Sequence, residues 1–447
     1  MCHGPLLGKI LRFVLPLVLS NILQLLFNAA DIVVVGRYVG SQALAAVGST
    51  SSLIQLITNV FVGLSVGVNV LAARYYGSKA DRDLSQTVHT AIVMSLVSGV
   101  FLIFAGIGLA RPMLQLMGSP DDVLSQSALY LRIYFAGMPA FMLYNFGSAI
   151  LRAAGDTRRP LYYLFAAGVL NVILNLWFVI SFGLGVAGVA LATVISQCLS
   201  AVLVLLTLMK SQGAMKVSWS KMRINRHKAA QIIGIGLPAG IQSAIFSVSN
   251  VLIQSAVNSF GSIAMAGSTS ANNLEGFVYT AMNAVYQACL SFTSQNVGGK
   301  KYSRINRILG TCLGVTLTIG LILGLGTVAL GPILLRIYSS DPEVIAFGMR
   351  RLRMVCSLYC LCGVMDTLVG SLRGMGFSLV PMISSLVGSC GLRVLWVYTV
   401  FAVDRSWDIL FLSYPVSWLL TIVCHVVYFL IVRKKLPKTD EPETAVA

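Results

Sequence analysis

Three acidic residues, Asp31, Glu275 and Asp366, lie within long apolar stretches of this 447-residue sequence. A charge at the centre of a membrane-spanning helix costs about 2.5 to 3.5 kcal/mol on insertion scales, so such residues mark ion or substrate pathways by default. A carboxylate in that setting can exchange a proton or hold a small cation. The sequence therefore predicts ion or substrate binding within a membrane.

Two asparagines accompany Asp31 in the first half of the chain. Asn171 and Asn175 are four residues apart, so they share one face of a helix. At the 1.5 Å rise of a helix, Asp31 and Asn175 reach similar depths, roughly 25 Å from the expected cytoplasmic side. We expect these residues to gather into one small polar site, which becomes a candidate cation-coupling site through the resemblance described below. The alternative is a hydrated Asp31 near the headgroups and an asparagine pair that only bonds helices together.

Glu275 lies on a helix face that also carries polar and aromatic side chains. About 12 residues separate it from the outer end of its stretch, which places it roughly 18 Å deep. The residues that share its face, and that we expect to line a cavity and contact substrate, are Asn272, Tyr279, Asn283 and Tyr286. Gln55 and Asn59 share a face of the second helix and extend the predicted substrate-binding set.

Asp366 and Arg393 complete the predicted substrate-binding residues. Asp366 precedes Arg373 by two helical turns, and an interfacial structural role is as well supported as binding. Arg393 lies roughly 21 Å into its stretch. Because an intramembrane arginine usually has a carboxylate or carbonyl partner, we favour a pair with Glu275 over binding of an anionic substrate.

Composition indicates the elements that position these residues. With 57% apolar residues and 11% charged residues, the chain cannot cover a water-soluble surface. Its apolar stretches are too long and too unbroken for β-barrel strands and predict an all-α integral membrane protein. The twelve expected spans are 11–37, 43–75, 87–110, 124–152, 160–180, 187–210, 230–257, 263–293, 308–330, 344–373, 379–402 and 408–432.

An internal repeat of 221 residues organises these spans. Leu151, Arg152, Gly155 and Pro160 recur as Leu372, Arg373, Gly376 and Pro381, and Gly77 and Lys79 recur as Gly298 and Lys300. A duplicated bundle with a site between its halves is a common plan for transporters. We expect an N-lobe at 1–210, a cytoplasmic linker at 211–229, a C-lobe at 230–432 and a cytoplasmic tail at 433–447.

The charge distribution predicts orientation. If the spans alternate, the side that holds both termini has 23 of the 32 lysine and arginine residues. This asymmetry follows the positive-inside rule, so we expect both termini to be cytoplasmic. We expect the chain to cross a cell membrane, either a bacterial inner membrane or a plasma membrane, many times. No soluble basic domain is present, which argues against nucleic-acid binding. The nine cysteines lie in or beside spans and predict reduced thiols, and Cys356, Cys360 and Cys362 predict packing rather than a metal site.

Several segments resemble the multidrug and toxic compound extrusion (MATE) transporters. In the first half these are Leu15-Pro16-Leu17, Asp31 to Arg37, Ala43 to Gly48, Leu151 to Arg158 and Gly185 to Ala190. In the second half they are Gly236 to Gly240, Asn258 to Gly261 and Leu372 to Gly374. The resemblance covers essentially the whole chain.

The resemblance implies two six-helix lobes that form a V, and export of small lipophilic or cationic compounds in exchange for H⁺ or Na⁺. It implies that Asp31 is the coupling carboxylate and that Asn171 contributes polar contacts. Many relatives have aspartate at the position of Asn175, so this chain has one titratable group there instead of two. We expect a monomer without a cofactor.

Three alternatives remain open. A lipid-linked saccharide flippase of the same superfamily would have a cationic cavity and often fourteen helices. An ion channel would not need opposed lobes. A membrane enzyme is disfavoured because no nucleophile and base pair and no metal-ligand spacing is present in the sequence.

Overall fold

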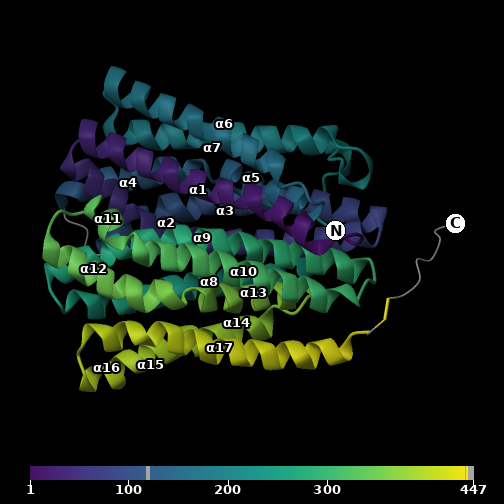
Figure 1. The fold of residues 1–447 in the computed structure, drawn as a ribbon. Coiled ribbons are helices and arrows are strands. Elements are labelled where there is room, and N and C mark those ends of the chain that lie inside the picture. Colours follow the sequence, from purple (N-terminus) through teal and green to yellow (C-terminus); the bar gives the residue numbers. More distant parts are fainter. Residues whose placement is uncertain (117–120, 438, 441–447) are drawn as a thin grey trace. The chain divides into compact units, whose positions relative to one another are not determined.

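The computed structural model describes residues 1–116, 121–437, 439 and 440. Throughout this part of the chain the regular structure is helical and contains no strand (Figure 1). The long helices lie roughly alongside one another within each part of the fold. Helices pair their backbone N–H and C=O groups internally, as the lipid environment requires. The predicted all-α class is confirmed.

Nine helical stretches in the described residues are long and apolar enough to cross a membrane. They are α1 (Leu6–Tyr38), α2 (Ser41–Gly77), α3 (Asp81–Leu116), α6 (Arg158–Leu176) with the π-turn η1 (Trp177–Ser181), α7 (Gly185–Lys210), α8 (Arg226–Asn258), α10 (Arg304–Ala329), the run from α14 (Leu379–Ser385) through η5 (Leu386–Gly391) and α15 (Leu392–Tyr398) to α16 (Val400–Val403), and α17 (Trp407–Lys435). The pair formed by α12 (Pro342–Val355) with η4 (Cys356–Leu358) and by α13 (Cys360–Gly374) is bent by 43° and counts as a tenth span if the two helices cross together.

The other two predicted spans also correspond to helices. The fourth is divided at Gly137 into α4 (Asp121–Ala136) and α5 (Met138–Ala153), and the eighth is the continuous 37-residue helix α9 (Ser262–Gly298). The polar residues from Ser268 to Glu275 lower the hydropathy of α9. A short helix, α11 (Gly331–Arg336), joins α10 to α12. Twelve membrane crossings in two lobes therefore remain a prediction.

Positions related by the sequence repeat have matching backbone geometry. Lys79 and Lys300 both have φ 56°, a left-handed conformation that is uncommon for residues other than glycine. Gly155 and Gly376 have φ 95° and 99°. Each lies in a turn that is closed by a 3.0 Å hydrogen bond, from Asp156 N to Leu151 O in one case and from Phe377 N to Leu372 O in the other. The same local signals thus end matched helices in the same way.

The chain divides into two compact units, which we describe separately. The amino-terminal unit is Leu19–Ala244, and the carboxyl-terminal unit is Met1–Val18 with Ile245–Ala447. Both divisions fall inside long helices, α1 and α8. The predicted lobe boundaries at 210 and 230 follow the order of the repeat, whereas these units assign the beginnings of α1 and α8 differently.

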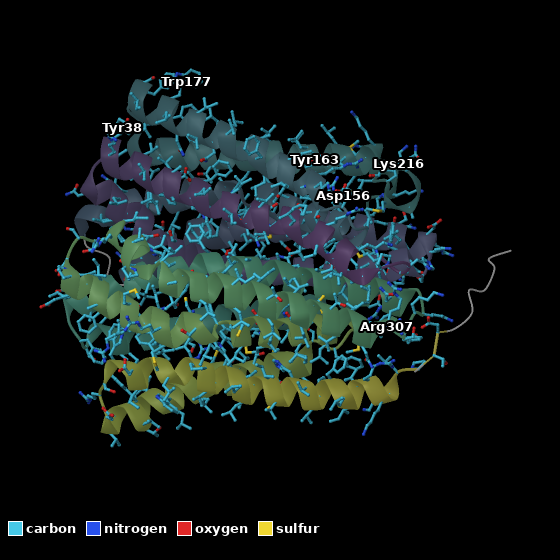
Figure 2. The ribbon with its side chains drawn as sticks, viewed as in Figure 1. Tyr38, Asp156, Tyr163, Trp177, Lys216 and Arg307 are labelled. Atoms are coloured by element: carbon cyan, nitrogen blue, oxygen red, sulfur yellow. The ribbon has the colours of Figure 1, made fainter. Side chains whose placement is uncertain are left out.

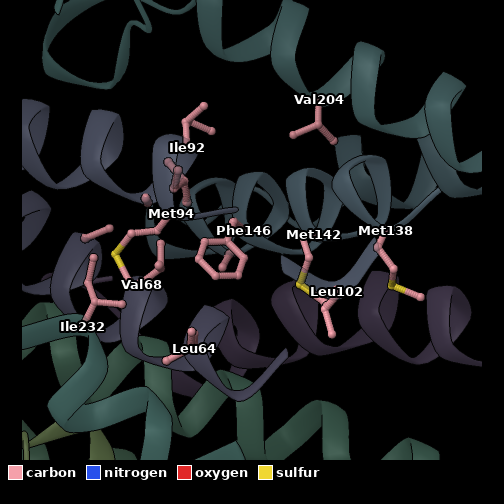
Figure 3. Close-up of a cluster of buried hydrophobic side chains, with 14 of the residues drawn as sticks. Leu64, Val68, Ile92, Met94, Leu102, Met138, Met142, Phe146, Val204 and Ile232 are labelled. Carbon is pink, nitrogen blue, oxygen red and sulfur yellow. The ribbon is translucent and has the colours of Figure 1, made fainter. Parts of the chain in front are cut away.

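A buried apolar core holds the amino-terminal unit together. It includes Leu64 and Val68 from α2, Leu102 from α3, Phe146 from α5 and Ile232 from α8 (Figure 3). At the surface of this unit, Tyr38 and Trp177 lie at one end and Asp156 and Lys216 at the other (Figure 2). Tyr38 and Trp177 are about half exposed. Aromatic residues at helix ends are typical of the membrane interface.

Glycines bring α2 and α8 into backbone contact in this unit. A Cβ at Gly63 would lie 2.2 Å from the backbone nitrogen of Gly240, and one at Gly67 would lie 2.2 Å from the Ile232 carbonyl oxygen. Conversely, a Cβ at Gly236 would meet Leu64 Cα at 2.6 Å. Each helix therefore has two glycines spaced four residues apart at the crossing. Such small residues allow membrane helices to approach closely.

The carboxyl-terminal unit includes the first turns of α1 in its core. Ile10, Phe13 and Leu17 pack in one cluster with Val285 and Phe292 of α9. The rings of Phe13 and Phe292 meet edge to face, with centroids 5.6 Å apart. The amino-terminal residues are thus part of the packing of a unit whose other residues come from the second half of the chain.

Candidate functional site

Asp31 lies on α1 beside α6, and glycine allows this approach. A Cβ at Gly168 of α6 would lie 1.8 Å from the ring of Phe27, one turn before Asp31. Two turns further along α6, the Asn175 side-chain amide donates a hydrogen bond to Asp31 Oδ1. The predicted meeting of Asp31 with the asparagine pair is therefore observed in the structure.

The hydrogen bonds continue from Asp31 into a third helix. Asn175 Nδ2 also donates to Asn171 Oδ1 over 3.1 Å, and Asn171 Nδ2 donates to Thr193 Oγ1 of α7 over 3.4 Å. Thr193 in turn donates to the Val189 carbonyl oxygen over 3.0 Å. Asp31, Asn171, Asn175 and Thr193 form one polar cluster, which we call the aspartate cluster. Asn171 and Asn175 are buried within it.

The donor set of the aspartate cluster suits a hard cation or a proton. Asn175 Oδ1 is fully buried and has no hydrogen-bond partner among the described residues. Carboxylate, carboxamide and hydroxyl oxygens are the ligands that hard cations prefer. A cation beside Asp31 would find these oxygens close together, while protonation of Asp31 would remove the charge.

Two tyrosines flank the aspartate cluster. Tyr130 and Tyr134 of α4 are stacked with ring centroids 6.0 Å apart, and both interact electrostatically with Asp31. Tyr134 also interacts with Gln197 of α7. Sequence reasoning missed Tyr130, Tyr134 and Thr193. The available signal was the spacing of Thr193 and Gln197, which lie on one face of an otherwise apolar helix.

Glu275 in the carboxyl-terminal unit forms a buried ion pair with Arg351. Arg351 Nε donates to Glu275 Oε1 over 2.8 Å and Nη2 donates to Oε2 over 2.7 Å, a bidentate arrangement. The same guanidinium donates to Ser268 Oγ over 2.6 Å and to Asn272 Oδ1 over 2.9 Å. Its Cζ lies 4.9 Å from the centroid of the Phe411 ring. The charge of Glu275 is thus balanced within the protein.

The expected pair of Glu275 with Arg393 is wrong. Arg393 donates from Nε to Ser417 Oγ over 2.9 Å and lies over the ring of Tyr414, 4.1 Å from its centroid. Trp418 also lies within reach, at 5.7 Å. Arg393 is therefore stabilised by aromatic faces and a hydroxyl, whereas Arg351 reaches Glu275 from α12.

The remaining predicted residues of α9 face α13. Tyr279 interacts electrostatically with Asp366 of α13, and Tyr286 accepts a hydrogen bond from Arg373 Nη1 of α13 over 2.9 Å. Asn283 accepts a hydrogen bond from Gln287 of its own helix over 3.3 Å. Asn272 and Tyr279 retain exposed surface, and Tyr286 is buried. The stripe of polar residues on α9 is therefore bonded to α12 and α13, with part of it open.

Gln55 and Asn59 lie on α2, where Gln55 is exposed and Asn59 is partly exposed. No disulfide joins any of the nine cysteines in the part of the chain that the structure describes. Within the described ranges, no group of three or more histidine, cysteine or acidic residues has the arrangement of a metal site.

The fold defines a polytopic helical membrane protein with a carboxylate inside a membrane-spanning helix. A family model described as MatE matches residues 16–177 and again residues 238–399. The chain therefore belongs to the MatE family, a family of membrane transporters, and the resemblance seen in the sequence is confirmed.

Known relatives agree with this assignment. The chain is 27% identical over 435 residues to the probable multidrug resistance protein YoeA of Bacillus subtilis, covering 95% of this chain and 93% of the relative. It is 25% identical over 356 residues to a FAD transporter of Shewanella oneidensis, covering 77% of each. The fold is similar to a multidrug resistance MATE family transporter in an outward-facing conformation, with a TM-score of 0.91, 21% identity and 98% coverage of both chains.

Proposed function

We propose that this chain exports small organic compounds across the membrane in exchange for H⁺ or Na⁺. The aspartate cluster is the coupling site. Asp31 binds the cation in one conformation and releases it when cargo occupies the other, so the ion gradient drives export. Family membership and the names of the relatives support transport, while the choice of cation comes from the chemistry of the cluster.

One observation carries this proposal, namely the difference between two of the three intramembrane acids, Asp31 and Glu275. Glu275 has a bidentate arginine partner. Asp31 has only the neutral amide of Asn175 as a hydrogen-bond partner, and no cationic side chain in the described residues forms an ion pair with it. A carboxylate without an internal counter-charge takes its charge balance from a mobile ion. Asp31 is therefore better suited to coupling than Glu275.

The available driving force is sufficient for concentrative export. One elementary charge moving across 100 mV supplies about 2.3 kcal/mol, which corresponds to roughly a 50-fold accumulation ratio. Because Asn175 is not an acid, the cluster offers one titratable carboxylate. We expect one coupling charge per cycle at this site.

The proposed substrate surface comprises polar and aromatic residues within each unit, most of them at least partly exposed. These are Gln55 and Asn59 in the amino-terminal unit and Asn272, Tyr279, Asn283 and Asp366 in the carboxyl-terminal unit. Tyr286 belongs to the same predicted set but is buried. Glu275 and Arg393 support this surface through their bonds to α12 and α17. A neutral Glu275–Arg351 pair leaves Asp366 as the acid available to a cationic cargo.

The decisive experiment compares wild type with Asp31→Asn in proteoliposomes. Efflux of a panel of cargo, including organic cations and FAD, is measured under a proton gradient alone and a sodium gradient alone. Asp31→Asn removes the only charge of the cluster, so we expect loss of ion-dependent efflux while the protein stays folded.

Asp404→Asn serves as the control because it removes an exposed acid outside the cluster. It is expected to transport as wild type does. Ion-coupled flux at the wild-type level in Asp31→Asn would contradict the coupling role of Asp31. Flux without any dependence on an imposed ion gradient in the wild type would contradict antiport itself.

A further inference from the structure

The segment that joins α7 to α8 is held firmly against the amino-terminal unit. Val217 is 2% exposed and belongs to the core of that unit. The backbone N–H of Ser218 donates to His89 Nε2 over 3.0 Å, and that of Asn225 donates to Thr90 Oγ1 over 3.1 Å. Two short helical turns, η2 (Gly213–Met215) and η3 (Trp219–Lys221), shape the segment.

The beginning of α8 is fixed by the same surface of α3. The Asn225 side chain accepts hydrogen bonds from the backbone N–H groups of His227 and Lys228, which caps α8, and it donates to Gln86 over 3.1 Å. Lys228 Nζ lies 2.6 Å from both Asp83 Oδ1 and Tyr75 Oη. The segment is therefore an ordered platform that hydrogen bonds hold against α2 and α3.

The exposed residues of this platform have an unusual composition. Trp219 is 63% exposed and Ile224 is 45% exposed. Four exposed cations accompany them, namely Lys216, Lys221, Arg223 and Arg226. No aspartate or glutamate occurs from Ser211 to Ala229. We call these six exposed residues the basic platform, and Lys216 marks its place in Figure 2.

We propose that the basic platform binds anionic phospholipid headgroups of the cytoplasmic leaflet. The platform connects two membrane-spanning helices, so it lies where headgroups are present. Tryptophan favours this interface, and each lysine or arginine near an anionic surface is attracted to it. Phosphodiester groups balance the four cations, while Trp219 and Ile224 enter the adjoining boundary with the acyl chains. This inference does not depend on the transport mechanism.

Three variants of the full-length protein test the proposal in vesicles of phosphatidylcholine mixed with phosphatidylglycerol. In the platform variant, Lys216, Lys221, Arg223 and Arg226 are replaced by glutamine. The charge control replaces four exposed arginines by glutamine on the predicted opposite side, Arg37, Arg111, Arg336 and Arg405. The third variant is Trp219→Phe, which identifies the signal of Trp219 among the five tryptophans of the chain.

The measurement is quenching of tryptophan fluorescence by brominated phosphatidylglycerol or brominated phosphatidylcholine. We expect the Trp219-dependent signal to show a preference for phosphatidylglycerol. In the platform variant this preference falls by at least about fivefold, the factor for one surface cation, and in the charge control it is retained. Addition of soluble glycerol phosphate leaves the quenching unchanged, because an intact lipid is the ligand.

Two outcomes overturn the proposal. One is equal quenching by the two lipids in the wild type, which would show that the platform does not select anionic headgroups. The other is an equal loss of preference in the platform variant and the charge control, which would show that only net charge matters. A thermal unfolding scan of each variant confirms that the compared proteins are folded.

Discussion

At the scale of single residues, the fold treats its two deeply placed acids differently. Asp31 meets amide groups, and Glu275 meets a guanidinium whose donors also satisfy Ser268 and Asn272. Asp31 has no cationic partner among the described residues, whereas Arg351 balances the charge of Glu275. Both residues are acids, so residue type does not distinguish their two roles. The hydrogen-bonding partner of each carboxylate does.

The Glu275–Arg351 pair predicts a large change in stability on mutation. Arg351→Met leaves a buried carboxylate without its partner, and loss of one member of a buried pair costs about 3–5 kcal/mol. Replacing both residues, as Arg351→Met with Glu275→Leu, is expected to restore most of the loss. Thermal unfolding of purified protein in detergent measures both effects.

The neighbouring residue supplies the control for this comparison. Arg350 pairs with Asp408 across an exposed surface at 3.0 Å, and such pairs contribute at most about 1 kcal/mol. Arg350→Met should therefore unfold close to the wild-type temperature. An equal loss for Arg350→Met and Arg351→Met, or no recovery in the double variant, would contradict this account.

Sequence reasoning at this scale found part of the site. The depths of Asp31 and Asn175 predicted their meeting, because helical rise fixes depth. The partner of Glu275 was missed, since Arg351 lies among the charged residues of α12, a composition typical of a membrane edge. A guanidinium that finds four acceptors and an aromatic face is buried despite this local composition. The spacing of residues along the sequence does not reveal such complementarity in three dimensions.

At the scale of elements, the crossing of α2 and α8 depends on the absence of side chains. A Cβ at Gly240 would lie 2.3 Å from the Val60 carbonyl oxygen, and neither backbone can yield easily. Gly240→Ala should therefore destabilise the protein by about 1–3 kcal/mol through overpacking. A fall in the unfolding temperature of purified protein is the measurement.

Gly234 on the same helix provides a matched control, because no atom lies within 4 Å of a Cβ at this position. Gly234→Ala is expected to leave stability unchanged or to raise it by up to about 1 kcal/mol, since alanine favours the helix. If the two alanine variants unfold at the same temperature, the close contact at Gly240 does not limit packing.

Helices were predictable because long apolar stretches are strong signals. The breaks and π-turns within these helices were harder to predict. The break at Gly137 and the π-turns η1 and η5 leave the apolar character of their stretches unchanged, so hydropathy has no means of locating them. The eighth predicted stretch, whose polar residues lower its hydropathy, is a continuous helix, α9.

At the scale of the whole molecule, the charge asymmetry predicts topology. Only Cys2, Cys198 and Cys424 are not buried among the nine free cysteines, so replacing these three by serine leaves six shielded thiols. In that background, Ser220→Cys should react with an impermeant maleimide only from the cytoplasmic side, and Ser340→Cys only from the opposite side. Labelling of intact cells and of inverted vesicles distinguishes these outcomes. Reaction of both positions from one side would refute the predicted alternation of spans.

The repeat was visible in the sequence, but the membership of the compact units was not. Repeats follow chain order, whereas packing depends on which surfaces meet. The first turns of α8 contribute Ile232 to the amino-terminal core, and the first turns of α1 contribute Phe13 to the carboxyl-terminal core. The sequence of neither helix indicates that its two ends pack in different cores.

This exchange sets the order in which a nascent chain can mature. Residues around Phe13 leave the ribosome first, yet their partner Phe292 is synthesised much later. The unit from Leu19 to Ala244 gains its last contributor as soon as α8 emerges. The unit in the middle of the chain can therefore fold early. The segment around Phe13 lies in the bilayer without its packing partners until most of the chain has been synthesised.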